Sequence, residues 1–321
     1  MNRRSMLLAS LSALAGTRAV AAAKWPDRPL RIVVPFPAGG AADVQARILA
    51  ATLTRMIEQP VVVENRSGAG GNIGALSVAK AEPDGYTLLM GTPGPLSINQ
   101  HLYKDMQFDP LRDFTPISFV SRIANVLVVN PSLPVSDVRS FVTFARAAQP
   151  PLSVGLPGKG SAAHLAIIAL TQMTGIRFNH VLYRGSAPAI ADLTTGVVPF
   201  MISEMPSVTP HVQAGRLRAL AVTTAQGWFA MPELPTLGSV VPGFESSGWF
   251  AIVGPRGMSP SVAGTISGFI DRALADPEVQ SRFKALGALP IGGSPLVQMK
   301  TESQKWGEVI TRAGPAIDQQ G

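Results

Sequence analysis

Ser161 and His164 come nearest to enzyme chemistry among the 321 residues of this sequence. Residues three apart on a helix share one face, so the serine hydroxyl and the imidazole could act as nucleophile and base. The serine lies outside a Gly-x-Ser-x-Gly motif, however, and no acidic residue stands near the histidine in sequence to orient its ring. We therefore interpret Ser161 as a helix cap and His164 as a polar group that faces a crevice, and we assign no catalytic residue. A Ser/His hydrolase is kept as a remote alternative.

Side chains that hold metals are scarce in the sequence. With no cysteine, the chain can form no disulfide, no thiolate nucleophile and no cysteine-ligated zinc or iron–sulfur site. None of the four histidines has HxxxH or HExxH spacing, which argues against a histidine-built metal site. The carboxylates Asp43, Asp192 and Glu204 form no recognisable acid–base pair. We therefore expect neither a metal nor a cofactor.

Two glycine-rich segments match nucleotide-binding loops in composition but not in spacing. Residues 68–74 read GxGxxxG instead of the dinucleotide fingerprint GxGxxG, and Asp84 is a poor partner for a ribose. Residues 155–161 place Lys159 before Gly160-Ser161, whereas a P-loop requires Gly-Lys followed directly by Ser or Thr. The sequence therefore predicts neither NAD nor ATP as a ligand.

Glycine turns stand between a predicted strand and a predicted helix at four places. In an open α/β sheet, ligands bind outside the carboxyl ends of the strands, where helix starts present free N–H groups and a partial positive charge. Any one of these turns is explained as a tight turn that needs glycine. Four such turns, all at the carboxyl ends of predicted strands, favour an anion site built from backbone N–H groups. The turns are Gly39-Gly40, Gly70-Gly71-Asn72, Gly160-Ser161 and Gly185-Ser186.

Short runs of β-branched residues, which must position these turns, alternate with stretches of helical spacing. This alternation is typical of a parallel α/β sheet. Expected strands cover residues 30–36, 61–63, 86–90, 152–154, 180–183, 197–202 and 217–222, and expected helices cover 41–57, 73–79, 161–173 and 187–195.

The length of the chain exceeds one ordinary core and suits two lobes of roughly 150 residues each. Two extended stretches, residues 117–129 and 246–253, could cross between the lobes. Three further helices are expected over residues 261–275, 277–286 and 295–310. If these helices return to the first lobe, lobe 1 comprises residues 24–122 and 246–321, and lobe 2 comprises residues 123–245. The expected fold class is α/β, with two lobes and two hinge-crossing strands that permit closure around a ligand.

Residues 1–23 have the pattern of an export signal. Arg3 and Arg4 precede an apolar run of about ten residues, too short to span a bilayer, and an A-x-A site predicts cleavage after Ala23. The arginine pair also permits a twin-arginine route, although such pairs are common in ordinary signals, so we favour the general secretory route. Loss of Arg3, Arg4 and Arg18 lowers the formal net charge from +7 to +4, because 24 basic residues then face 20 acidic ones. No run of Lys or Arg with interleaved aromatics remains, which argues against nucleic acid as a partner.

A series of segments runs in a fixed order through nearly the whole chain after residue 23. They are WPDRP (25–29), IVVPFPAGG (32–40), VVVENR (61–66), GAGGNIG (68–74), PDGYTLL (83–89), NVLVVNP (125–131), YRGSAPA (183–189), GRLRALAVT (215–223), WF (249–250) and DPEV (276–279). In order and spacing this series resembles the Bug family, also called TctC-type receptors. Each segment alone is a weak signal, whereas together they are specific.

The resemblance implies a periplasmic solute-binding protein, and not an enzyme, that serves the membrane subunits of a tripartite tricarboxylate transporter. Its fold would be a type II Venus flytrap whose lobes close on a small carboxylate, and we expect a monomer. Family ligands range over di- and tricarboxylates, acidic amino acids and aromatic acids. The expected ligand-binding residues are Phe36, Pro37, Ala38, Gly39, Gly40, Asp43, Gly71, Asn72, Thr92 and Gly94 in lobe 1, and Lys159, Ser161, His164, Tyr183, Gly185, Ser186, Ala187 and Glu204 in lobe 2.

Three positions depart from the family pattern and leave the identity of the carboxylate open. Residues 93–96 read Pro-Gly-Pro-Leu where the family often has a Ser/Thr-rich turn that ends in His, so this wall loses hydroxyl groups. Lys159 ends a Pro-Gly-Lys segment that replaces small neutral residues, and it is either a solvated loop lysine or a contact for a second carboxylate. Glu204 stands where Asp is usual.

An alternative function stays open beside transport. A periplasmic sensor could present the same closed complex to a membrane signalling protein. Both functions depend on a surface that forms when the lobes close, so the sequence does not separate them.

Overall fold

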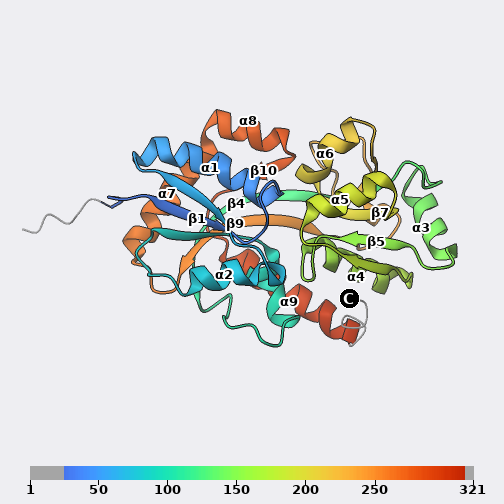
Figure 1. Ribbon diagram of the computed structural model, residues 1–321, viewed down its shortest axis with the longest axis horizontal. Coiled ribbons are helices and arrows are strands. Elements are labelled where there is room, and N and C mark those ends of the chain that lie inside the picture. Colours follow the sequence, from blue (N-terminus) through green and yellow to red (C-terminus); the bar gives the residue numbers. More distant parts are fainter. Residues whose placement is uncertain (1–24, 315–321) are drawn as a thin grey trace, which may run out of the picture.

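The computed structural model describes residues 25–314. The predicted export signal, with its cleavage site after Ala23, lies outside the described residues. The described chain forms two α/β lobes along the longest axis of the molecule (Figure 1). Within residues 25–314, no helix has the length and apolar character needed to cross a membrane.

The sheet of lobe 1 is mixed, although the sequence pattern predicted a parallel one. Three strands run parallel in the order β2-β1-β3, and β9 pairs antiparallel with both β3 and β4. The direction changes because β4 carries the chain out of lobe 1 and β9 carries it back. The strands are β1 (Leu30–Val34), β2 (Val61–Asn65), β3 (Thr87–Gly91), β4 (Phe114–Val129), β9 (Ser247–Pro255) and β10 (Ala288–Pro290), which pairs with β4.

Helices cover both faces of this sheet. Side chains alternate along a strand, so Ile32 and Val34 face α1, α7 and α8, whereas Val33 faces α2. Burial on both faces explains the β-branched run Ile32-Val33-Val34 in β1. The helices are α1 (Ala41–Ile57), α2 (Asn72–Ala79), α7 (Pro260–Ala275), α8 (Pro277–Ala285), α9 (Leu296–Ala313) and the short π-helical turn η3 (Gly94–Ile98).

Lobe 2 repeats this layered arrangement. Strand β5 is parallel to β6 and β7, and the second half of β4 pairs antiparallel with β7 and β8. Helices again lie on both faces, with separate apolar clusters beneath them. The elements are β5 (Ser153–Leu156), β6 (Asn179–Leu182), β7 (Phe200–Glu204), β8 (Arg218–Val222), α3 (Val138–Ala147), α4 (Ala162–Thr174), α5 (Ser186–Thr195) and α6 (Met205–Gln213).

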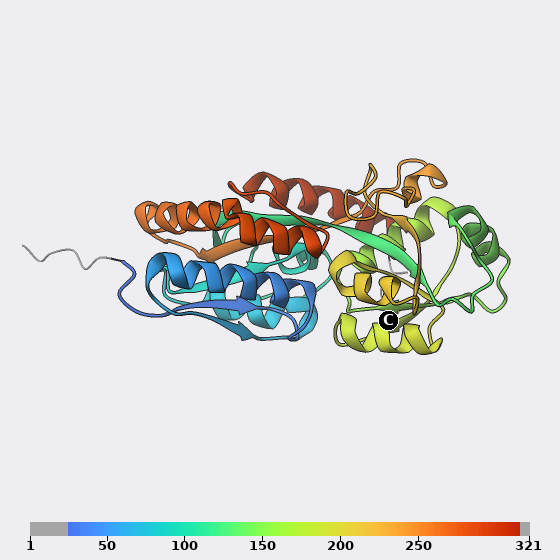
Figure 2. The ribbon, with the colours of Figure 1, turned by 90° about the horizontal axis from the view of Figure 1, so that it is seen from above.

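Two segments cross between the lobes. In β4, residues 114–124 pair with β9, and residues 125–129 pair with β7 and β8, so the strand runs from one lobe into the other (Figure 2). The chain returns at Ser246, whose N–H donates to the carbonyl of Thr223 at 2.8 Å directly before β9. The predicted two-lobe class with two crossing segments is confirmed. The lobe boundaries at residues 122/123 and 245/246 stay a prediction.

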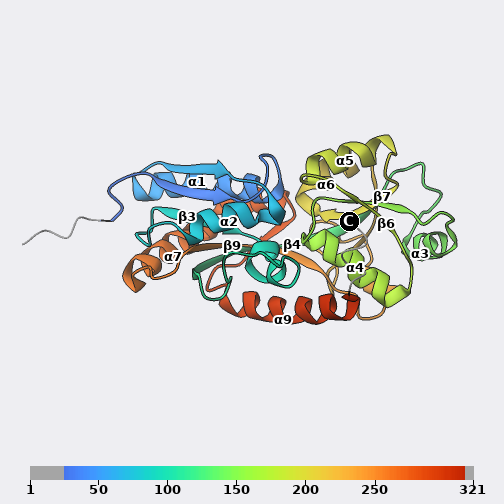
Figure 3. The same cartoon turned by 60° about the horizontal axis from the view of Figure 1, so that its bottom comes forward.

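Helix α9 lies along both lobes (Figure 3). Met299 packs into the core of lobe 1, and further along the helix Trp306 packs with Leu165 of α4. Gln172 Nε2 of α4 donates to the carbonyl of Val309 at 2.9 Å. The helix that was expected to return to lobe 1 therefore also contacts lobe 2.

Candidate functional site

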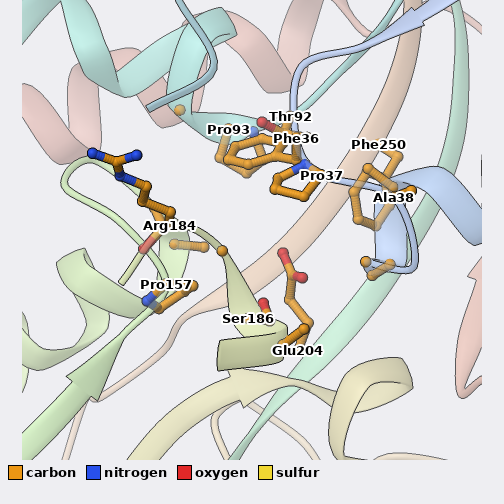
Figure 4. A pocket seen from close by; sticks show the side chains of 18 of the residues that line it. Phe36, Pro37, Ala38, Thr92, Pro93, Pro157, Arg184, Ser186, Glu204 and Phe250 are labelled. Atoms are coloured by element: carbon orange, nitrogen blue, oxygen red, sulfur yellow. The ribbon is translucent and has the colours of Figure 1, made fainter. Parts of the chain in front are cut away.

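A cavity lies between the lobes, at the carboxyl ends of strands from both (Figure 4). Three of the four predicted glycine turns reach it, each between a strand and the following helix. Prolines, alanines, glycines and two phenylalanine rings make most of the wall, which suits a small ligand with an apolar body. Its lining comprises Phe36, Pro37, Ala38, Gly40, Ala41, Ala42, Thr92, Pro93, Gly94, Pro157, Ser161, Ala162, Arg184, Gly185, Ser186, Ala187, Pro188, Glu204 and Phe250.

Asp43 lies outside this lining and fixes the first turn from behind. Its buried carboxylate accepts hydrogen bonds from the Gly39 N–H at 2.9 Å, from Arg47 Nε at 3.0 Å and from Asn65 Nδ2 at 3.0 Å. Asn65 Nδ2 also donates to the carbonyl of Phe36 at 3.0 Å. These bonds hold both ends of the turn that carries Pro37, Ala38 and Gly40.

The charge of Asp43 is kept despite its burial. Burial by itself raises the pKa of this carboxyl, but the hydrogen bonds from Arg47, Gly39 and Asn65 outweigh it and lower the pKa below its ordinary value. The carboxylate is therefore ionised at neutral pH, and the turn keeps its shape.

Two helix starts face the cavity without a side-chain cap. Helix α1 begins after Gly40 and α5 begins after Gly185, and neither N-cap residue makes a side-chain hydrogen bond, although Asp43 in the first turn of α1 accepts from the Gly39 N–H. The first N–H groups of a helix lack partners within the helix and carry a partial positive charge. A Cβ on Gly185 would lie 3.3 Å from Pro37 Cγ, so these two starts, one from each lobe, approach each other. Together they can bind an anion.

Ser161 and His164 bond to backbone groups. Ser161 Oγ accepts from the N–H of His164 at 3.2 Å, which confirms the predicted helix cap. His164 Nδ1 accepts from the Gly160 N–H at 3.1 Å, and burial, with nearby His180 and Lys159, lowers the pKa of His164 to about 3. Ser161 lines the cavity, whereas the buried, neutral His164 ring fixes the turn before α4. Neither contact gives the serine a base, so the hydrolase alternative finds no support here.

Tyr183 and Lys159 also lie outside the lining. The Tyr183 O–H donates to Asp192 Oδ2 at 2.7 Å, and burial together with this carboxylate raises the pKa of Tyr183 to about 12. The carbonyl of Lys159 accepts from the Tyr103 O–H at 3.2 Å, which joins the two lobes. A contact between the Lys159 ammonium and a second carboxylate stays a prediction.

The turn before α2 does not line the cavity. Neither Gly71 nor Asn72 belongs to the lining, and Asn72 Oδ1 accepts from Asn99 Nδ2 at 2.6 Å. A Cβ on Gly70 would lie 2.7 Å from the carbonyl oxygen of Lys159 in lobe 2. This turn therefore forms a close backbone contact between the lobes beside the cavity.

Two charged side chains line the cavity. Burial raises the pKa of Glu204 to about 7, and Figure 4 shows its carboxylate directed toward Pro37 and Ala38 across the cavity. Arg184 is an exposed side chain that extends away from Glu204 in the same view. Thr92 adds a buried hydroxyl for which the described chain offers no hydrogen-bond partner.

Sequence reasoning missed part of the lining. Most of the missed residues adjoin a predicted turn residue, so adjacency was the available signal. Phe250 is different, because the segment WF (249–250) marked it only as part of the family series, and the crossing strand β9 places it at the cavity. The residues absent from the expected set are Ala41, Ala42, Pro157, Ala162, Arg184, Pro188 and Phe250, whereas Pro93 belongs to the wall that the sequence placed at residues 93–96.

Metal-ligand clusters are absent from residues 25–314, where no three His, Asp or Glu side chains are grouped to hold an ion. The part of the chain that the structure describes therefore offers backbone N–H groups, hydroxyls and two charged side chains to a ligand in the cavity.

Comparisons with known proteins agree on one family. The sequence profile described as "Tripartite tricarboxylate transporter family receptor" matches residues 45–314. Protein BugT of Bordetella pertussis is 37% identical over 323 residues and 99% of each chain is covered. The structure "R. palustris Rpa4515 with adipate" is 39% identical with a TM-score of 0.87, covering 90% of this chain and 98% of that one. MatC from Rhodopseudomonas palustris with bound malate is 27% identical with a TM-score of 0.83, covering 89% and 100%.

Proposed function

The chain belongs to the TctC family of tripartite tricarboxylate transporter receptors, as its sequence segments predicted, and from this premise we propose that it captures a small carboxylate between its lobes and delivers it to a membrane transporter. The family consists of periplasmic solute-binding receptors and not of enzymes. The observation that carries the proposal is the pair of uncapped helix starts, α1 and α5, at one cavity. Each start stabilises a nearby negative charge by about 0.3–1 kcal/mol, and by up to about 2 kcal/mol when partly buried.

A linear dicarboxylate is the ligand class that this cavity favours. Adipate and malate, which the two structures named above hold, are both dicarboxylates. Helix starts and hydroxyls bind the carboxylate ends, and the rings of Phe36 and Phe250 cover the apolar middle. The direct contacts come from Phe36, Pro37, Ala38, Gly40, Thr92, Gly94, Ser161, Gly185, Ser186, Ala187 and Glu204, while Gly39, Asp43, Gly71, Asn72, Lys159, His164 and Tyr183 hold the surrounding turns.

Calorimetry and thermal unfolding of the purified exported protein test capture. Adipate, malate and their monocarboxylate analogues are titrated in turn. A micromolar Kd corresponds to about 8 kcal/mol, and a hundredfold excess of acid over Kd adds roughly 2.7 kcal/mol to the free energy of unfolding. The absence of a thermal shift with a broad panel of acids, or consumption of the acid on incubation, contradicts the proposal.

Delivery needs a separate experiment in cells. Deletion of this chain is expected to abolish uptake of radiolabelled acid, and expression of the intact chain is expected to restore it. If uptake persists while a transcriptional response to the acid is lost, the protein is a sensor and delivery is wrong.

A further inference from the structure

Glu204 is the one acidic residue that lines the cavity within the described chain. It ends β7 and pairs across the ladder with Asn125 of β4, so two strands fix its backbone. It also stands at the N-cap of α6, where its side chain makes no capping bond. The carboxylate is directed instead into the space between the lobes, toward Pro37 and Ala38 (Figure 4).

No described residue neutralises this carboxylate. No hydrogen bond or ion pair to it occurs within residues 25–314, and Arg184 on the same lining extends away from it (Figure 4). Burial is the cause of its raised pKa, and no charged group contributes. The charged and titratable groups on the surrounding elements are Asp43, Arg47 and Arg55 of α1, Lys159 and His164 at the start of α4, Tyr183, Arg184 and Asp192 around α5, and His211 of α6.

An anionic ligand changes the protonation equilibrium of Glu204. The helix starts of α1 and α5 attract a carboxylate into the cavity that Glu204 lines. Two carboxylates in contact repel each other when both are ionised, and this repulsion favours proton uptake by one of them. Burial raises the pKa of Glu204 to about 7, so about half of the ligand-free protein carries the neutral carboxyl near pH 7. The neutral carboxyl has an O–H that can donate to a ligand oxygen.

We propose that Glu204 is the specificity-determining acid of the cavity, which stays protonated in the complex and donates its O–H to a carboxylate oxygen of the ligand. One proton then accompanies each carboxylate that binds at a pH above the pKa of the free protein. The neutral carboxyl also discriminates among ligands. A ligand with a hydrogen-bond acceptor at this position binds more tightly than one with a hydroxyl or ammonium donor there. This inference rests on the proposed function, since it concerns how the same cavity binds its acid.

The consequence is an affinity that falls as pH rises. Only the protonated fraction of the protein is competent to bind, and above about pH 7 this fraction falls tenfold per pH unit. About half of the protein is protonated near pH 7 and about one hundredth near pH 9, so the Kd for adipate is expected to rise about fiftyfold between these values. An ionised Glu204 that accepts from a ligand hydroxyl or ammonium gives the opposite slope.

Calorimetry with adipate tests the proposal on the intact exported protein. Titrations run from about pH 6.5 to about pH 9, each in two buffers of different ionisation enthalpy, because the difference in heat counts the protons taken up. The wild type is expected to take up about one proton per adipate near pH 8. Glu204→Gln keeps a hydrogen-bond donor at the same place, so it is expected to bind adipate within about threefold of the wild type near pH 6.5, with no proton uptake and no pH slope. Asp105→Asn, an exposed change remote from the cavity, is expected to behave as the wild type.

Several outcomes overturn the inference while the proposed function stands. These are adipate binding without proton uptake, an affinity that rises with pH, and loss of binding in a folded Glu204→Gln variant near pH 6.5. If adipate binds neither protein, the adipate assignment is wrong, and carbon-13 NMR of the ligand-free protein decides the inference. A carboxyl signal that is missing from Glu204→Gln and titrates near pH 7 supports it, and a midpoint below about pH 5 overturns it.

Discussion

The turns that follow β1 and β2 share a sequence signal and differ in their surroundings. Both place two adjacent glycines between a strand and a helix. A Cβ on Gly39 would meet no atom within 4 Å, and one on Gly40 would meet a single carbonyl oxygen at 3.6 Å. A Cβ on Gly70 would lie 2.7 Å from the Lys159 carbonyl oxygen, and one on Gly71 would meet three side chains at 3.4 Å. The first turn is open at the cavity, and the second is packed between the lobes.

The difference separates two reasons for glycine before a helix. At Gly40, the missing side chain leaves the N-terminus of α1 accessible to a ligand. At Gly70, it lets the backbones of two lobes approach each other. A strand, two glycines and a helix therefore do not identify an anion site by themselves, because the neighbours of the turn decide which group it meets.

Gly40→Pro is expected to have the largest effect, the loss of detectable adipate binding. The φ of Gly40 is −76°, a value that proline adopts, so the fold is expected to persist. Proline removes the N–H, and a lost bond to a charged acceptor costs about 1.5–3 kcal/mol before crowding by the ring is added. Calorimetry with adipate measures the loss, and circular dichroism checks the fold.

Gly40→Ala is the matched control, because it keeps the N–H and its Cβ has room beside the Pro37 carbonyl. It is expected to bind adipate within about tenfold of the wild type. Unchanged affinity in a folded Gly40→Pro variant would remove the open turn from the site and break the comparison.

Asp43→Asn tests whether the open turn owes its shape to side-chain bonds. The change leaves the Gly39 N–H and Arg47 without their charged acceptor, so the free energy of unfolding is expected to fall by about 2–3 kcal/mol. The pKa of Asp43 is lowered in the folded protein, so its stabilising contribution is present above its ordinary pKa and is lost as pH falls. The gap between wild type and variant in urea denaturation is therefore expected to narrow below about pH 4. The exposed change Asp105→Asn is expected to alter the free energy of unfolding by no more than about 0.5 kcal/mol. If Asp105→Asn destabilised the protein as much as Asp43→Asn, the stability of the turn would not depend on the bonds of Asp43.

Much of the fold was predictable because its signals are local. Burial on both faces gives β1 the apolar run of residues 32–34, and the Ser161 cap is predictable from its neighbours in sequence. Strand β10 was missed because three residues carry no periodicity and its pairing with β4 is a tertiary event. Helix α3 was missed although a capping box, formed by the N-cap Asp137 and by Ser140 in the first turn, marks its start.

The site was harder to predict than the fold, because its contacts join distant segments. Asp43 looked like a ligand contact, and its role in the turn depends on Asn65, which lies in the next strand. The packing of Gly70 depends on the backbone of Lys159 in the opposite lobe. Phe250 reaches the cavity only because β9 lies between β3 and β4. Spacing along the chain carries none of this information.

Gly74→Ala tests the close packing of α2, the helix that follows the second turn. A Cβ there would lie 2.7 Å from the Arg66 carbonyl oxygen and 2.9 Å from Pro35 Cα, both backbone atoms that cannot rotate away. Overpacking is expected to cost about 1–3 kcal/mol in urea denaturation while adipate affinity stays within about threefold. Gly264→Ala in α7 has no atom within 4 Å of its Cβ and is expected to be neutral or to stabilise by up to about 1 kcal/mol. Equal stability of the two variants would show that α2 is not packed against Arg66 and Pro35 as described.

Arg184→Gln is expected to have the smallest effect, and it asks whether side-chain charge adds to the backbone site. Arg184 is exposed at the cavity, so its attraction for adipate is screened and amounts to about 0.2–1 kcal/mol, a loss of at most about fivefold. The loss should be smaller for hexanoate, which carries one charge, and should disappear at high salt because exposed charges are screened there. Arg139→Gln, exposed in α3 away from the cavity, is the matched control and should change neither affinity. A loss above about tenfold that persists at high salt would make Arg184 a direct ligand, and the binding energy would then come from a side chain and not mainly from the helix starts.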